Sequence, residues 1–201
     1  MGKASTQRLR QQMGFIAEAD KLKNIFRRSY ISDRSRREND AEHSWHLCLM
    51  TLLLLEHSNF ENIDALKVLK MVIVHDIVEI DAGDTYIYDN AAKADQAIRE
   101  RRAAERLFGM LPSDQEAEFH SLWSEFELGE SSESRFAKAI DRLHPMMLNY
   151  LAQGKTWNEN SVSEPQVRAI NSKIADGSDA LWQYADELIR ESVDKGWLPR
   201  S

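Results

Sequence analysis

The chain has 201 residues, of which 42% are hydrophobic, and it carries a formal net charge of -7 at pH 7. This length and apolar content suffice for one well-buried domain, and no stretch rich in Pro, Gly or Ser divides the chain in two. The negative charge argues against a nucleic-acid polymer as partner, because phosphate backbones are held by basic surfaces, and no apolar run approaches the roughly 20 residues that cross a membrane.

Cysteine usage bears on the cellular setting. Cys48 is the only cysteine, so no disulfide can form within the chain, and a reducing cytoplasm is the natural setting. The amino terminus lacks the apolar core of a secretory signal. Its opening, MGKAST, fits the loose pattern for N-myristoylation at Gly2, which many sequences match by chance. We therefore expect a cytoplasmic protein with no membrane partner.

Helical periodicity dominates the first part of the chain, and strand alternation is nearly absent. The spacing of apolar residues predicts helices over about residues 5–26, 39–57 and 62–80. Asn39 or Asp40 is the expected N-cap of the second helix, because a short polar side chain there can accept a hydrogen bond from the first turn. The segment 82–84, Ala-Gly-Asp, breaks the pattern of the third helix.

The rest of the chain continues in the same way, with helices expected over about residues 91–110, 113–126, 134–151 and 178–195. Leu111 and Pro112 close the first of these, and Ser113 or Asp114 can cap the next. The pattern as a whole predicts an all-α protein. The chain has no Gly-rich phosphate loop, so a bound phosphate would be held by side chains, a metal or helix ends.

Ionisable residues stand where burial is expected. The apolar run 71–74 predicts a buried helix, and His75 and Asp76 follow it directly. Burying such groups is costly unless they are paired, hydrogen-bonded or metal-bound, although this doublet by itself also fits an ordinary surface or core pair. His43 and Asp141 are ligand-type residues in two other predicted helices. Two imidazoles and two carboxylates suit one divalent ion of Mn, Fe, Co, Ni or Zn better than Mg or Ca.

Four segments carry a resemblance to a known family: RRENDAEH, AEHSWH, VHDIVEIDAGDT and KAIDRLHP. Their order resembles that of the HD-domain metal-dependent phosphohydrolases, and most of all the small single-domain group of 5'-deoxynucleotidases and HD-domain-containing protein 2. The resemblance runs from about residue 22 to 151. It implies an all-α HD-domain helical bundle in which residues 1–201 form a single domain, with its core at about 22–151 and a C-terminal helical extension at about 163–195.

The same resemblance implies roles for the polar residues. His43, His75, Asp76 and Asp141 would bind the metal ion. Glu79, one helical turn beyond the doublet, is the first choice for transferring protons to and from a metal-activated water, and Asp84 is the second. Without the ligand set, Glu79 would be interpreted as a solvent-facing residue and Asp84 as a turn residue. His46 and His144 are expected behind the ligands or in the core.

Basic residues gather just before the first predicted ligand. Arg28 lies where relatives have an arginine that contacts phosphate, and a guanidinium fork suits a phosphate dianion. Arg27 is the adjacent alternative. Arg36 would either reach the pocket or pair with Glu38.

The activity implied is that of a 5'-nucleotidase acting on nucleoside or deoxynucleoside 5'-monophosphates, in a protein that forms a homodimer. Ser29 stands where some relatives have an aromatic residue that helps to distinguish deoxyribose from ribose, so the resemblance implies no deoxyribose preference. Tyr86 and Tyr88 follow the site turn and would stack on a base. Two alternatives remain: an HD enzyme for a phosphodiester, pyrophosphate or non-nucleotide monoester, and a nucleotide-binding or interaction module with a structural metal.

Overall fold

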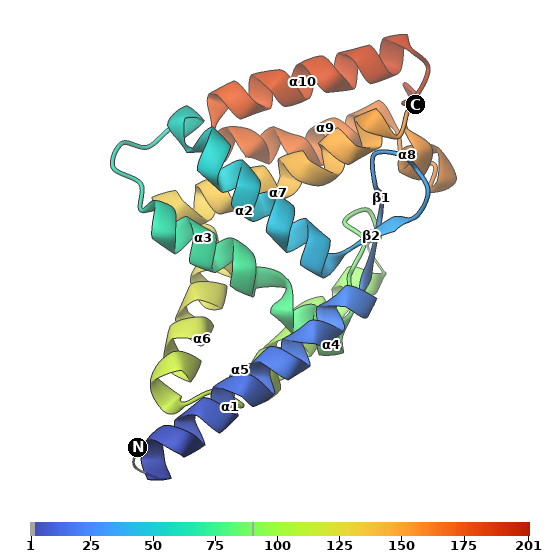
Figure 1. The fold of residues 1–201 in the computed structure, drawn as a ribbon. Helices are drawn as coiled ribbons and strands as arrows, with labels where there is room; N and C mark the ends of the chain where they lie inside the picture. The colour runs from blue at the N-terminus through green and yellow to red at the C-terminus, as the bar shows by residue number, and fades with distance from the viewer. Residues whose placement is uncertain (1–2, 90) are drawn as a thin grey trace.

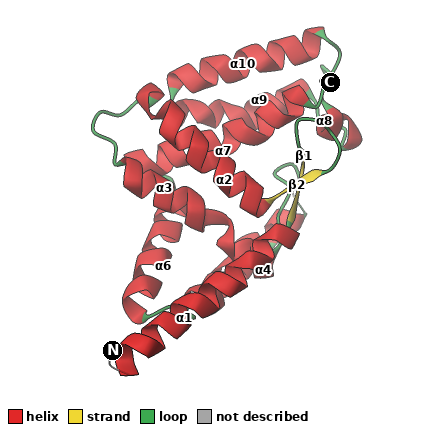
Figure 2. Ribbon diagram, in the orientation of Figure 1, coloured by secondary structure: helices red, strands yellow, loops and turns green. Residues whose placement is uncertain are grey.

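The computed structural model describes residues 3–89 and 91–201, so Gly2, the candidate myristoylation site, lies outside the described residues. The α-helices are α1 Lys3–Ala19, α2 Asp40–Leu54, α3 Ala65–Val74, α4 Glu79–Ala82, α5 Gln96–Phe108, α6 Ser113–Leu128, α7 Ser132–Leu151, α8 Lys155–Glu159, α9 Glu164–Asn171 and α10 Asp179–Asp194. Short 3-10 segments cover Asp20–Asn24, Leu55–His57, His75–Val78, Ala92–Ala94 and Ser172–Asp176. The strands are β1 Phe26–Tyr30 and β2 Arg37–Asn39. The expected all-α bundle is confirmed, with one small hairpin added (Figure 2).

Helix α7 is the centre of the bundle, and α2, α3, α6 and α10 all pack against it (Figure 1). Its apolar face forms the middle of a hydrophobic core in which Phe136 and Ile140 are fully buried. Ile174 and Ile189, from the C-terminal part of the chain, belong to the same core. A second apolar cluster joins α1, α5 and the end of α3. Val74, Ile77 and Val78, which flank His75 and Asp76, belong to this second cluster.

The first predicted helix is shorter than expected. Helix α1 ends at Ala19, and after a 3-10 segment the chain enters β1 instead of continuing as helix to residue 26. Strand β1 pairs antiparallel with β2, with Phe26 opposite Asn39 and Tyr30 opposite Arg37, and an irregularity between these pairs. The sequence FRRSY has no apolar alternation, so periodicity did not predict a strand there. The strand forms because it pairs with a later segment, and such a non-local interaction leaves no local pattern in the sequence.

The third predicted helix is interrupted at the point where ionisable residues begin. Asp64 caps α3 by accepting a hydrogen bond from Lys67 N at 3.1 Å. The helix then tightens into the 3-10 turn His75–Val78, continues as α4, and ends at Gly83. Gly83 has a φ of 74°, a conformation that glycine adopts without steric cost. In a 3-10 turn residues three apart eclipse, so Asp76 and Glu79 share one face.

The remaining helices follow the sequence prediction more closely. Asn39 caps α2 in a capping box with Glu42, as its side chain suggested. Helices α8 and α9 were not anticipated as separate elements. They are short, and α9 begins with a capping box between Ser163 and Gln166. Among the described residues, no helix combines the length and apolar character needed to cross a membrane.

Candidate metal centre and active site

Three elements bring four ligand-type side chains together. His43 comes from α2, His75 and Asp76 from the 3-10 turn, and Asp141 from α7. The Nε2 atom of His43 lies 3.0 Å from Asp141 Oδ1 and 3.8 Å from Asp76 Oδ2. The Nε2 atom of His75 lies 3.0 Å from Asp76 Oδ1 and 3.7 Å from Asp141 Oδ1. Donors bound to one ion at about 2.1 Å lie about 3 Å apart at right angles, so these spacings suit a single metal ion.

The tautomer of His75 supports the same interpretation. Its Nδ1 lies 2.9 Å from the carbonyl oxygen of Val72, and a carbonyl only accepts, so Nδ1 carries the hydrogen. In the neutral ring, which is the form that binds a metal ion, the Nε2 atom therefore presents a lone pair. It is buried and has no hydrogen-bond partner among the described residues. An orphaned imidazole nitrogen that faces two carboxylates is the arrangement expected of a metal ligand.

The charges in this cluster are unbalanced in a way that a cation would correct. Burial opposes the charged form of His75, but Asp76 and Asp141 outweigh it and raise the pKa of His75 to about 10. Burial also opposes ionisation of Asp76, yet His75 and Arg27 lower its pKa to about 2. The two imidazoles likewise hold the pKa of Asp141 well below its usual range, against the effect of burial. The ionised carboxylates are stabilised by nearby positive charge. A divalent cation can provide this charge when it displaces the protons of the imidazole rings.

A group of acids adjoins the ligands. The carboxylate oxygens of Asp40, Asp76 and Glu79 lie within 4.8 Å of one another, and all three side chains are buried. Burial and the charges of Asp76 and Asp40 raise the pKa of Glu79 well above its usual range. Burial and Asp76 raise the pKa of Asp40 to about 7. A carboxyl group that keeps its proton near neutrality beside a metal site is suited to proton transfer.

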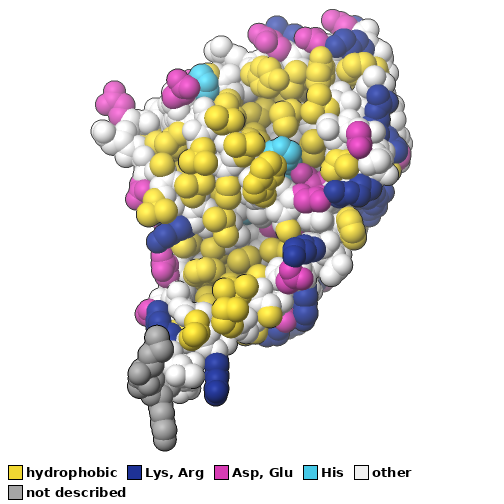
Figure 3. All heavy atoms as spheres, viewed as in Figure 1, with side chains coloured by type: hydrophobic (Ala, Val, Ile, Leu, Met, Phe, Trp, Pro, Cys, Tyr) yellow, Lys and Arg dark blue, Asp and Glu magenta, His cyan; other side chains and the backbone are white. Residues whose placement is uncertain are grey.

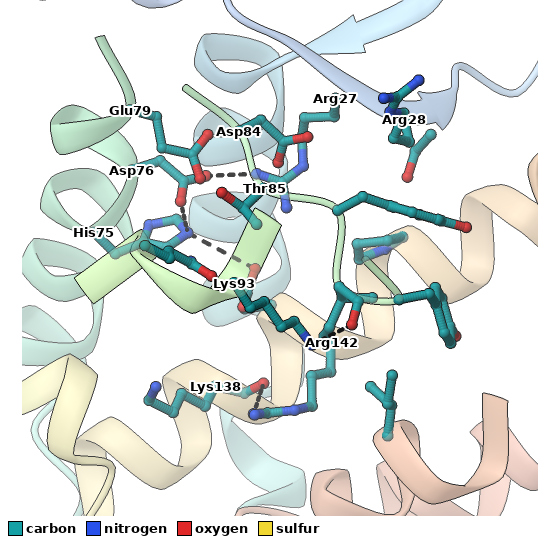
Figure 4. Close-up of a pocket in the computed structure, with 18 of the residues that line it drawn as sticks. Arg27, Arg28, His75, Asp76, Glu79, Asp84, Thr85, Lys93, Lys138 and Arg142 are labelled. Atoms are coloured by element: carbon teal, nitrogen blue, oxygen red, sulfur yellow. Dashed lines mark hydrogen bonds and ion pairs between the residues drawn. The ribbon is translucent and has the colours of Figure 1, made fainter. Parts of the chain in front are cut away.

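The three predicted substrate arginines lie in different surroundings. Arg27 points inward, and its guanidinium contacts Asp76 at 2.7 Å (Figure 4). It also contacts Asp40 at 3.3 Å. Arg28 is exposed at the wall of the pocket and has no ion-pair partner among the described residues. Arg36 donates to both carboxylate oxygens of Glu42 on the surface, and it is not among the residues that line the pocket.

Three of the four ligand-type residues, His75, Asp76 and Asp141, line a cavity of about 270 Å³, and His43 lies behind them. Asp84, whose pKa is raised mainly by burial, lines the same cavity, as do Tyr86 and Tyr88. Three further basic residues of the wall, Lys93, Lys138 and Arg142, were not singled out from the sequence (Figure 4). Lys138 and Arg142 are one turn apart on α7, on either side of Asp141, and this spacing is the signal that would have found them.

Behind His43 lies another polar group that sequence reasoning only partly located. His144 and Glu38 are almost fully buried, at 0% and 1% exposure. Burial lowers the pKa of His144 well below its usual range, so its ring is neutral. His46 is partly exposed, and its ring stacks at 4.6 Å from that of His144. His144 thus lies in the core behind His43, where it was expected, while the assignment of the metal donors stays a prediction.

These features are those of one protein family. The profile described as HD domain matches residues 19–182, which is most of the chain, and the chain therefore belongs to the HD domain family. Its fold is that of the crystal structure of a predicted metal-dependent phosphohydrolase from Magnetospirillum magnetotacticum MS-1. The two share 48% sequence identity and a TM-score of 0.92, and the alignment covers 96% of each chain.

Two curated relatives carry names that describe an activity. The protein 5'-deoxynucleotidase HDDC2 of Bos taurus is 26% identical over 134 residues, which are 66% of this chain and 63% of that protein. The protein 5'-deoxynucleotidase hdd1 of Schizosaccharomyces pombe is 25% identical over 165 residues, covering 80% of this chain and 73% of that protein. The chain thus aligns with just under two thirds of the length of the bovine relative.

Proposed function

We propose that this protein is a metal-dependent phosphohydrolase that releases phosphate from nucleoside 5'-monophosphates. The observation that carries the proposal is the convergence of two imidazole nitrogens and two carboxylates beside the buried acid Glu79, next to a cavity whose wall holds Arg28. The names of the curated relatives agree with a nucleotide 5'-phosphate as substrate. A mere binding module needs no buried acid next to its metal.

The side chains of the site have separate roles in the proposed reaction. When bound by His43, His75, Asp76 and Asp141, a divalent cation makes water acidic near neutral pH and offsets charge on the phosphoryl oxygens. Arg28 binds the phosphate, because its guanidinium is free of ion pairs among the described residues. Glu79 transfers protons between the attacking water and the leaving oxygen. Asp84, which lines the same pocket near Glu79 (Figure 4), is the second candidate for that role.

The leaving group is proposed to be a nucleoside. Tyr86 and Tyr88 line the cavity with their ring centroids 5.2 Å apart, which offers an aromatic edge for a base. The Tyr86 hydroxyl is buried without a partner among the described residues, so a ligand can satisfy it. Ser29, also in the wall, is too small to exclude a 2'-hydroxyl group, and we propose that ribo- and deoxyribonucleotides are both accepted.

The test is phosphate release from a panel of ribo- and deoxyribonucleoside 5'-monophosphates by metal-stripped protein supplied with Mn, Co, Ni, Zn or Mg. We expect release with a transition metal and its loss in an Asp76→Ala variant. Release only from phosphodiesters, pyrophosphates or non-nucleotide monoesters would replace the proposed substrate by the corresponding alternative. Nucleotide binding without turnover under every metal would favour a binding module with a structural metal.

The remaining parts of the proposal concern setting and organisation. The mixed nitrogen and oxygen donors favour Mn, Fe, Co, Ni or Zn over Mg. The shared core of α7 and the C-terminal helices supports a single domain spanning residues 1–201. The free thiol of Cys48 fits a cytoplasmic protein, and the negative charge fits a small phosphate ester better than a nucleic-acid polymer.

We also propose that the chain forms a homodimer through the face of α2 and α3. Figure 3 shows this face largely covered by hydrophobic side chains. Six large hydrophobic residues of α2 and α3, together with Tyr184 of α10, are each between 38% and 67% exposed: Trp45, Leu49, Leu52, Leu53, Leu66, Ile73 and Tyr184. At roughly 200 Å² for a fully exposed side chain of this size, they leave about 800 Å² uncovered, more than a monomer ordinarily exposes in one patch and about what each partner buries in a stable dimer.

Sedimentation of the wild-type protein and of two charge variants tests the dimer. Leu52→Glu places a charge in the patch and is expected to give a monomer. Ile98→Glu, at an apolar position on α5 that is 57% exposed against 67% for Leu52, is the matched control and should leave the dimer intact. A wild-type monomer at micromolar concentration, or equal effects of the two variants, would refute this interface.

A further inference from the structure

The two ring nitrogens of His43 face different groups. Nε2 faces the carboxylates of the metal centre, whereas Nδ1 lies 3.0 Å from Nδ1 of His144, in a fully buried contact. Glu38 closes this inner group. Its Oε1 lies 3.7 Å from His144 Nε2, and its Oε2 lies 3.7 Å from His43 Nδ1. None of these residues lines the active-site cavity, so Glu38 and His144 cannot touch a substrate bound there.

Hydrogen positions in this group follow from the acceptors available. Two nitrogens at 3.0 Å share one hydrogen, and a metal-binding His43 must leave Nε2 bare, so its hydrogen is on Nδ1. His144 must then accept through Nδ1 and carry its own hydrogen on Nε2. That hydrogen points toward Glu38, which only accepts when ionised. The three residues are thus consistent with a single arrangement of hydrogens in which His43 is ready to bind metal.

Two unpartnered atoms support this arrangement. His144 Nε2 and Glu38 Oε2 are both buried, and neither forms a hydrogen bond among the described residues. Leaving such atoms unpartnered is unfavourable. A slight closure of the 3.7 Å gap to Glu38 Oε1 would pair His144 Nε2, and Glu38 Oε2 lies 3.7 Å from the Nδ1 hydrogen donor of His43. We infer that His144 and Glu38 are positioning residues that fix the tautomer and the orientation of His43 for metal binding. This inference rests on the proposed metal centre.

Variants at His144 separate hydrogen bonding from packing. His144→Asn keeps an acceptor close to the position of the imidazole Nδ1, whereas His144→Leu fills the space without one. We expect the Leu variant to bind Co²⁺ or Mn²⁺ about 10- to 100-fold more weakly in competition with a chelator, the usual effect of losing such a partner, and the Asn variant to recover most of that loss. The visible absorption bands of bound Co²⁺ should shift in the Leu variant and return toward the wild type in the Asn variant.

Glu38→Gln is the second variant, and it keeps the argument testable if the Leu protein does not fold. It retains the shape of the side chain but removes its charge, and we expect it to weaken Co²⁺ binding about 10-fold. Because Glu38 acts through His144, the double variant should lose less affinity than the product of the single losses. Urea unfolding in EDTA should show a cooperative transition for each variant used, which establishes that its metal affinity is that of a folded protein.

The outcomes distinguish this inference from the metal centre itself. If the wild-type protein binds no divalent ion, both are refuted. If the wild type binds metal but the Leu and Gln variants match it in affinity and in the Co²⁺ spectrum, only the positioning role is refuted. Equal losses in the Leu and Asn variants would show that the ring acts by packing and would also overturn the inference.

Discussion

The buried guanidinium of Arg27 gives the sharpest prediction. Its side chain is 14% exposed and contacts two carboxylates, on Asp76 at 9% and on Asp40 at 0% exposure. Removing one partner of a buried ion pair leaves an uncompensated buried charge, which costs about 3 to 5 kcal/mol. Because His75 still supplies positive charge to Asp76, we expect Arg27→Met to lose about 3 kcal/mol of unfolding free energy without metal.

Metal should reduce that loss. Arg27 carries positive charge next to the donor set, so its removal lets the site bind a divalent cation more tightly, and tighter binding stabilises the folded state in proportion to the logarithm of affinity. A tenfold gain in affinity corresponds to about 1.4 kcal/mol. Urea unfolding should therefore show that the unfolding free energy of Arg27→Met is about 3 kcal/mol below that of the wild type in EDTA. In saturating Mn²⁺ this difference should be smaller by about 1 kcal/mol.

A matched control comes from a surface pair. Arg36 and Glu42 form a bidentate contact, but their side chains are 49% and 39% exposed, so Arg36→Met should leave the unfolding free energy nearly unchanged with or without metal. If Arg27→Met costs as little as this control in EDTA, the reasoning about the buried pair is wrong.

Other variants test separate roles in the site. Asp141→Ala should abolish metal retention, measured by elemental analysis, together with turnover, and a fully active, metal-replete variant would remove Asp141 from the site. Glu79→Gln should retain metal and lower kcat by about 10²- to 10⁴-fold, and unchanged kcat would exclude it from proton transfer. Arg28→Ala should lower kcat/KM by about 10- to 100-fold through loss of a charged hydrogen bond to phosphate, and an unchanged value would move the phosphate elsewhere. The folded state raises the pKa of Asp40 from 3.8 to about 7, so the stability that the protonated carboxyl contributes is fully present at low pH and is lost as pH rises to about 7. Between about pH 5 and 7.5, the metal-free Asp40→Asn variant should therefore lose less unfolding free energy than the wild type. Equal dependence of unfolding free energy on pH in the two proteins would contradict this.

Helices were predictable because their apolar residues recur with the helical period, which is a local property of the sequence. Strand β1 was not, since FRRSY has no apolar alternation and depends on pairing with residues 37–39. The tight turn at His75–Val78 was also missed, because periodicity does not distinguish a 3-10 turn from the end of an α-helix. The prediction that Asp76 and Glu79 share a face nevertheless agrees with the structure, since residues three apart do so in both forms.

The part of the site that could be predicted from the sequence is its set of ligand-type residues. His43, His75, Asp76 and Asp141 were chosen by residue type and order, and the structure brings their donor atoms together, while their binding of metal stays a prediction. The inner partners were harder to find. Glu38 lies in a charged stretch typical of a solvated surface, and only the folding of β2 against α2 and α7 buries it.

The short hairpin has a consequence for how the protein can vary. Strand β1 carries Arg27, which neutralises buried acids, next to Arg28, which faces the cavity, and β2 carries Glu38 behind the ligand His43. Side chains of a strand alternate between faces, so a slip of one residue would exchange the two arginines. Substrate anchoring, acid neutralisation and ligand alignment thus depend on one register. Insertions should be tolerated in the turn at residues 31–36 but not within either strand, and sequence drift in this family should lengthen the turn while leaving the strands at constant length.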